Sequence, residues 1–95
     1  MSCLSELSTE ARTLMAGIWK LLVAKSDPSE PVFTVEDLSK VLFWLPRGTI
    51  YTRLTRLAKK GYIERIKKGV YRVTNRGMCV ISELDNEVKD LVSFP

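Results

Sequence analysis

The chain has 95 residues, of which 45% are hydrophobic and 27% are charged, and its formal net charge is +4. This composition is that of a globular protein, and the length suits one domain with a modest core that a second chain could complete. Histidine is absent, which excludes zinc sites with histidine ligands. The sequence has no apolar run of membrane-spanning length, and its start lacks the basic and apolar regions of a signal peptide. We therefore expect an intracellular, cytoplasmic protein without a membrane partner.

The two cysteines, Cys3 and Cys79, have no spacing that suits a metal site. In a reducing cytosol, we expect two free thiols. The alternative is a disulfide, which occurs inside the cells of organisms that grow at very high temperature. The sequence predicts neither a metal site nor a cofactor.

Positive charge is concentrated in one segment. Residues 44–76 contain ten Lys or Arg residues and a single acid, Glu64, for a net charge of +9, whereas the remainder contains five basic and ten acidic residues, for a net charge of −5. A solvated surface helix would mix both signs at spacings of three or four residues. The segment does not, which favours a polyanionic partner. Charge alone leaves nucleic acid, a membrane surface and an acidic protein open as that partner.

Two helices are predicted in the first half of the chain. The first covers residues 8–25, because apolar residues recur there at steps of three and four. The stretch "SDPSEP" breaks that pattern, and "PVFT" predicts a short strand. The second helix covers residues 34–44, with Thr34 as N-cap and Asp37 as the acid three residues later. It should stop before Pro46, because the residue before a proline disfavours helical backbone.

The second half is predicted to add a helix, a hairpin and a final helix. After the short connection "WLPRG", a helix covers residues 47–60 and ends at Gly61 in the left-handed conformation. The runs "YIERI" and "VYRVT" on either side of "KKG" predict a β-hairpin over residues 62–74. Thr74 then caps a helix over residues 75–93. We expect one domain over residues 1–95, mainly α-helical with a small β-hairpin, that is, an α+β fold.

The predicted order contains a helix-turn-helix followed by a hairpin. The second helix of a helix-turn-helix fits the major groove of DNA. The stretch "GTIYTRLTRLAKKGYIER" resembles the third helix and first wing strand of winged-helix transcription regulators of the MarR, PadR and penicillinase-repressor types, and "VYRVTNRG" resembles the usual end of that motif. The resemblance covers about residues 33–84. It implies a winged helix-turn-helix with extended N- and C-terminal helices, in which the hairpin is the wing.

The third helix holds the first group of candidate DNA-binding residues. Its exposed face is expected to present Thr49, Thr52, Arg53 and Arg56. An arginine can bond to O6 and N7 of guanine, and a threonine methyl group can contact the methyl group of thymine. The alternative is that these side chains contact only phosphates or are solvated. We expect at least one arginine to read a base.

The turn and the wing hold the remaining candidates. The amides of Gly48 and Thr49, together with Arg47, lie at a helix start, which suits a phosphate oxygen, although a glycine that permits a tight bend is an equally good interpretation of Gly48. The cations around the hairpin tip suit phosphates or a narrow minor groove, and they are Arg65, Lys67 and Lys68. Arg72 has two interpretations, as a DNA contact or as a brace for the wing.

The terminal helices carry more apolar surface than one small core requires, so we expect a seam with a second copy of the chain. The candidate interface residues are Ile18, Trp19, Leu22, Ile81, Leu84, Val88 and Leu91. Packing of the same residues within one chain is the alternative, and both can hold at once. The acids of these helices, Glu10 among them, are expected to point away from DNA.

These features predict a sequence-specific, homodimeric transcription regulator that binds double-stranded DNA. Enzymatic activity is not expected, because the sequence has no histidine, no Gly-rich phosphate loop and no paired carboxylates in an apolar setting. One alternative is a winged-helix module for protein interaction, which would favour an apolar third helix. Another is a structural protein that binds DNA or RNA without sequence preference, which would favour a lysine-dominated surface.

Overall fold

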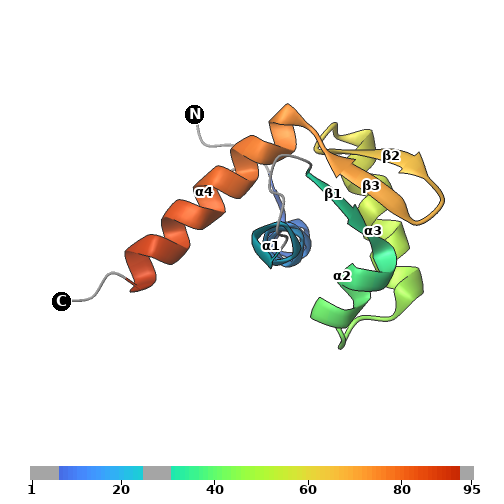
Figure 1. The fold of residues 1–95 in the computed structure, drawn as a ribbon, viewed down its shortest axis with the longest axis horizontal. Coiled ribbons are helices and arrows are strands. Elements are labelled where there is room, and N and C mark those ends of the chain that lie inside the picture. Colours follow the sequence, from blue (N-terminus) through green and yellow to red (C-terminus); the bar gives the residue numbers. More distant parts are fainter. Residues whose placement is uncertain (1–6, 25–30, 93–95) are drawn as a thin grey trace.

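The computed structural model describes residues 7–24 and 31–92, with side chains as far as residue 84. That part of the chain contains four helices and three strands, and the α+β class expected from the sequence is confirmed (Figure 1). The helices are α1 (Thr9–Ala24), α2 (Val35–Val41), α3 (Arg47–Lys59) and α4 (Asn75–Val92). The strands are β1 (Val32–Thr34), β2 (Ile63–Lys67) and β3 (Val70–Val73).

Helix α2 is shorter than the helix over residues 34–44 that the sequence suggested. Its N-terminus forms as expected, because the hydroxyl of Thr34 accepts a hydrogen bond from the amide of Asp37 at 3.1 Å. The helix ends at Val41, since Leu42 leaves the helical region with φ −100° and ψ 57° and residues 42–44 form a turn. Leu42 is nevertheless buried. The apolar periodicity therefore continues past the end of the helix.

The sheet has three strands in the order β1-β3-β2, and both pairings are antiparallel. Strands β2 and β3 form the expected hairpin, with Gly69 in its turn at φ +76°. Strand β1 adds to the other edge of β3, where Phe33 lies opposite Tyr71 and their rings stack with centroids 5.8 Å apart. The short strand before α2 thereby fixes the start of the helix-turn-helix to the hairpin.

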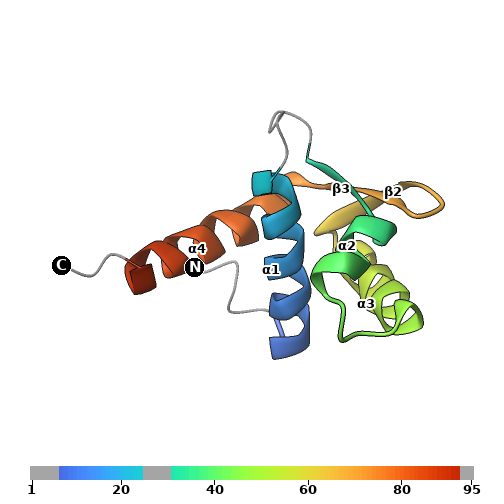
Figure 2. The ribbon, with the colours of Figure 1, turned by 60° about the horizontal axis from the view of Figure 1, so that its bottom comes forward.

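Helix α1 lies in the middle of the molecule, between α4 on one side and α2 and α3 on the other (Figure 2). Its residues Leu14, Met15 and Ile18 are fully buried. A Cβ atom at Gly17 would lie 3.1 Å from the side chain of Leu42, so the absence of a side chain at this position lets α1 approach α2 closely. The core is continuous and receives buried residues from the helices and from all three strands.

The junction between the hairpin and α4 is tight. Thr74 caps α4, because the amide of Gly77 donates to its hydroxyl oxygen at 3.2 Å, and the same hydroxyl donates to the carbonyl of Gly61. Gly61 ends α3 in the left-handed region, at φ +86°, as expected. A Cβ atom at Gly77 would collide with the backbone oxygen of Tyr62, so this position has no room for a side chain. From this junction, α4 projects away from the sheet (Figure 1).

Cys79 lies on the exposed side of α4 and is disulfide-bonded. The expectation of a free thiol is therefore wrong for this cysteine, and the alternative of a disulfide holds. Cys3, the other cysteine of the chain, lies outside the described residues.

We expect Gly77→Ala to lower the free energy of unfolding, since the new methyl group must displace the Tyr62 backbone. Overpacking of this kind costs roughly 1–3 kcal/mol. Gly48→Ala is the matched control, because it makes the same change within a helix where, apart from the neighbouring backbone of α3, no described residue lies within 4 Å of the new Cβ. It should raise stability by up to about 1 kcal/mol through helix propensity. Urea titration of both variants measures the difference, and equal effects would contradict the tight junction.

Candidate nucleic-acid interface

Helix α3 has one face in the core and one face toward solvent. Ile50, Leu54 and Leu57 recur at spacings of three and four and are buried, which fixes the rotation of the helix. On the other side, a shallow hollow is lined by Glu10, Pro46, Gly48, Thr49, Thr52, Arg53 and Arg56. The structure therefore brings five of the expected DNA-binding residues together on one surface, which we call the α3 surface.

The side chains of the α3 surface differ in exposure. Thr52 and Arg56 are exposed, whereas Thr49 and Arg53 are half-buried. The hydroxyl of Thr52 donates to the backbone oxygen of Gly48 at 2.9 Å. This bond occupies the hydroxyl proton, so the methyl group and the oxygen lone pairs of Thr52 are the groups that a ligand can contact.

The start of α3 is open to an anion. No described side chain caps this helix, and its first turn contains Arg47 and no acidic residue. The first amides of a helix have no partner within the helix and carry its positive end. Gly48 lies inside the helix and its Cβ position is free, so a tight bend does not require glycine there. The interpretation in which the amides of Gly48 and Thr49 bind a phosphate is therefore better supported than the one in which a tight bend requires glycine.

The wing turn lies beside α3. The hydroxyl of Tyr51, a residue of α3, is 3.7 Å from the position that a Cβ atom would occupy at Gly69 in the wing turn. The three expected wing cations are exposed: Arg65, Lys67 and Lys68. Figure 1 shows the hairpin and α3 at the end of the molecule opposite to the tip of α4. The cations of the wing and those of α3 thus lie at the same end.

The strand register separates the roles of two wing arginines. Arg65 lies opposite Tyr71, and Arg72 lies opposite Glu64, the single acid of the basic segment. Burial raises the pKa of Tyr71 above its usual value of 10.0, and the nearby Arg65 cation opposes part of that shift. Tyr71 is therefore neutral at physiological pH. The register favours the interpretation of Arg72 as a brace for the wing.

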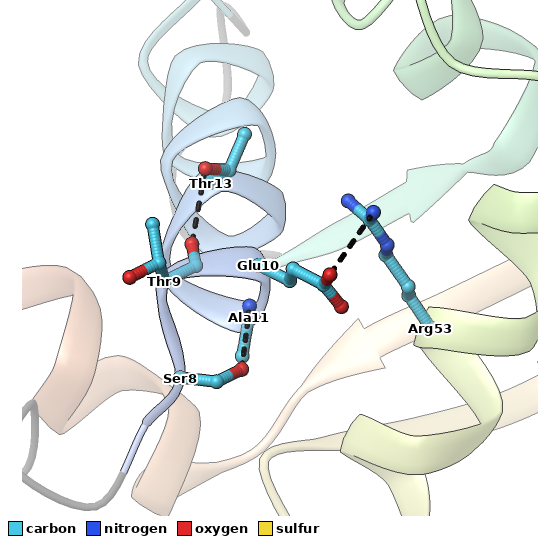
Figure 3. Close-up of polar contacts among 6 residues, drawn as sticks. All are labelled: Ser8, Thr9, Glu10, Ala11, Thr13 and Arg53. Carbon is cyan, nitrogen blue, oxygen red and sulfur yellow. Dashed lines mark hydrogen bonds and ion pairs between the residues drawn. The ribbon is translucent and has the colours of Figure 1, made fainter.

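One acid of α1 lies against α3, contrary to the expectation that the acids of the terminal helices point away from this surface. An Oε1 atom of Glu10 is 3.9 Å from an Nη2 atom of Arg53 (Figure 3). The side chain of Arg53 is 21% exposed and that of Glu10 is 63% exposed. The side chain of Arg53 is therefore less exposed to solvent than the sequence suggested. The contact depends on how α1 packs against α3, so no local sequence pattern predicts it.

The candidate dimer residues are divided between the core and the surface. Ile18, Ile81 and Leu84 are buried within the chain, whereas Trp19 and Leu22 are half-buried. The side chains of Val88 and Leu91 lie outside the described ones. A second shallow hollow is lined by Trp19, Leu22, Val23, Pro31, Met78, Ile81 and Ser82. Part of the expected seam thus packs inside one chain, and the rest borders this hollow.

The structure also shows exposed apolar side chains that the sequence analysis did not single out. Val23 and Met78 are exposed beside the second hollow, at 66% and 37%. Phe43 and Trp44, in the turn between α2 and α3, are exposed at 79% and 58%, and their rings meet edge to face at 5.3 Å. Contiguous patches of exposed apolar side chains mark surfaces for association, whereas single ones are ordinary.

Within the described residues, no group of three or more metal-binding side chains is found. In the same part of the chain, no helix combines the length and the apolar character needed to cross a membrane.

Comparison with known proteins found a matching family model and a similar solved structure. Residues 29–74, slightly less than half of the chain, match the model of a family described as "Transcriptional regulator, AbiEi antitoxin". The crystal structure of the reduced form of MarR from E. coli is similar with a TM-score of 0.63 and 19% sequence identity, over 93% of this chain and 64% of that one. No curated protein matches the chain.

The structural match confirms the winged-helix fold, and an identity this low shows the fold alone. The chain spans slightly less than two thirds of the length of that MarR structure. The family match over residues 29–74 agrees with the resemblance to winged-helix transcription regulators that the sequence predicts.

Proposed function

We propose that this winged-helix chain is a sequence-specific transcription regulator that binds double-stranded DNA as a homodimer in the cytoplasm. The observation that carries the proposal is the α3 surface, where Thr52, Arg53 and Arg56 line one hollow beside an uncapped helix start. The family match to transcriptional regulators supports it.

In this proposal, α3 enters the major groove, which is wide enough for a helix. Arg56 is exposed, whereas Arg53 is half-buried, so Arg56 is the better candidate for a bidentate contact with guanine. The methyl group of Thr52, one turn earlier, is suited to the methyl group of thymine. The amides of Gly48 and Thr49, with Arg47, would bind a phosphate at the edge of the groove.

The wing would bind the DNA backbone or a narrow minor groove through Lys67 and Lys68. Lysine has a flexible side chain with a compact charge, which suits phosphate better than the edge of a base. The hydroxyl of Tyr51 on α3 lies close to Gly69 in the wing turn, so both elements would approach the same duplex. Arg65, on β2, adds a further positive charge to this hairpin.

The homodimer would form through the outer helices. Trp19 and Leu22 on α1 and the exposed Val23 and Met78 supply an apolar surface that a second copy would cover. A two-fold dimer would present two α3 helices to half-sites about one DNA turn apart, roughly 34–36 Å. The site would therefore be close to palindromic.

A module for protein interaction is the second candidate function. The exposed pair of Phe43 and Trp44 favours it, because aromatic side chains are enriched at protein interfaces. The charge of α3 favours DNA, since an apolar third helix would be expected for protein binding alone. A protein that does not bind duplex DNA but still associates with a protein partner would support the second candidate.

Base reading and backbone binding can be separated by two variants. Arg56→Ala should cost about 1–3 kcal/mol for each base that it no longer reads on a selected duplex, and far less on random DNA. The double variant Lys67→Ala, Lys68→Ala should weaken binding to both duplexes alike. It should also flatten the log–log dependence of affinity on salt by roughly 0.9 for each phosphate that the wing no longer neutralises.

Fluorescence anisotropy titrations of both variants on both duplexes, at several salt concentrations, make this comparison. Equal losses of affinity for Arg56→Ala on the two duplexes would mean that α3 contacts only the backbone. An unchanged salt dependence of the lysine variant would remove the wing from the interface.

Sedimentation equilibrium tests the dimer. The wild type should be dimeric at micromolar concentration, and Val23→Glu with Met78→Glu should be monomeric, because burial of unpaired carboxylates is costly. Both side chains are exposed in one chain, so the monomer should still fold. Val23→Thr, which keeps the shape and adds no charge, is the control and should remain dimeric. A wild type that stays monomeric, both free and on its best duplex, would contradict the proposed assembly.

A further inference from the structure

A carboxylate lies within the otherwise cationic α3 surface. Among the described residues that line the hollow of that surface, Glu10 is the one acid. It also lines the adjacent hollow, together with Arg53, Arg56 and Lys60. A surface built only to attract phosphates would be improved by a neutral or basic residue at this position.

Helix α1 holds Glu10 in a defined place. The first turn of α1 is stabilised by the hydroxyl of Ser8, which accepts a hydrogen bond from the amide of Ala11 at 3.2 Å (Figure 3). The following turns are anchored in the core by Leu14 and Met15, and α1 contacts α3. Figure 3 shows the carboxylate of Glu10 pointing from α1 toward the guanidinium of Arg53. The acid therefore faces Arg53 as a consequence of the fold.

The effect of this carboxylate depends on what Arg53 meets. A guanidinium has five N–H donors arranged on more than one edge, so it can bond to guanine through one edge and remain beside a carboxylate on another. A phosphate carries the same sign of charge as Glu10, so its approach to Arg53 is opposed. Glu10 is thus compatible with guanine reading and unfavourable to capture of the backbone.

We propose that Glu10 is a positioning residue that raises sequence specificity, by orienting Arg53 toward a base and by opposing contact of Arg53 with phosphate. The inference rests on the proposed function and deepens it. It assigns a role in readout to a residue outside the helix-turn-helix. Repulsion of the wrong partner is a general route to specificity, since specificity is a difference of affinities.

The test compares Glu10→Gln with the matched control Glu36→Gln. Glu36 carries the same charge, is exposed on α2 and has no ion-pair partner among the described residues. Glu10→Gln should bind random duplex about two- to fivefold more tightly per subunit, the factor that an exposed ion pair contributes. Its affinity for the selected duplex should rise less, so the ratio of the two affinities falls. Its salt dependence on random duplex should steepen by roughly 0.9 for each additional phosphate that Arg53 neutralises.

A double-mutant cycle with Arg53→Ala tests whether the effect of Glu10→Gln on specificity depends on Arg53. If Glu10 acts through Arg53, Glu10→Gln should leave the affinity ratio unchanged in the Arg53→Ala background. The inference is overturned if Glu10→Gln matches Glu36→Gln in ratio and salt dependence, or if the change in ratio persists without Arg53. Equal weakening on both duplexes would also overturn it, because a residue that only supports the fold would behave in that way.

Failure of the proposed function gives a different result. A wild type that binds random and selected duplex equally would refute sequence-specific binding. The salt dependence on random duplex would still test whether Glu10 opposes phosphate binding, because that measurement needs no selected site.

Discussion

The burial of one face of α3 determines what the rest of the molecule can do. Ile50, Leu54 and Leu57 fix the rotation of the helix, so Thr52 and Arg56 must face solvent. Helix α1 provides part of the opposing core surface and β1 ties the start of α2 to the hairpin. The wing turn then lies within reach of Tyr51. A change in the rotation of α3 would move the whole candidate interface.

Local sequence patterns predict where most helices and strands begin and end. Thr34 and Thr74 act as caps because a hydroxyl can satisfy an open amide in the first turn of a helix, and that chemistry is visible in the residue type. The end of α3 at Gly61 can be predicted for a similar reason, since left-handed backbone favours glycine. The sequence predicts an end of α2 that is too late, because Leu42 is buried in a turn, where the apolar spacing continues without helical backbone.

Features that depend on tertiary packing could not be read in the same way. The approach of Glu10 to Arg53 joins two helices that are far apart in the sequence, and the expected direction of that acid was wrong. The disulfide of Cys79 likewise depends on the redox environment and on where the chain places a partner. For Ile18, Ile81 and Leu84, periodicity marked apolar faces correctly, but it does not distinguish a core within one chain from a seam between two.

Sequence-specific recognition of duplex DNA is the central claim, and selection of binding sites from a pool of random duplexes tests it most directly. The account predicts enrichment of one motif, a near-palindrome with half-site centres about 10–10.5 base pairs apart. Selected duplexes should bind more tightly than random ones at the same salt concentration. A pool that shows no enriched motif after repeated rounds, with every duplex bound equally, would contradict the claim.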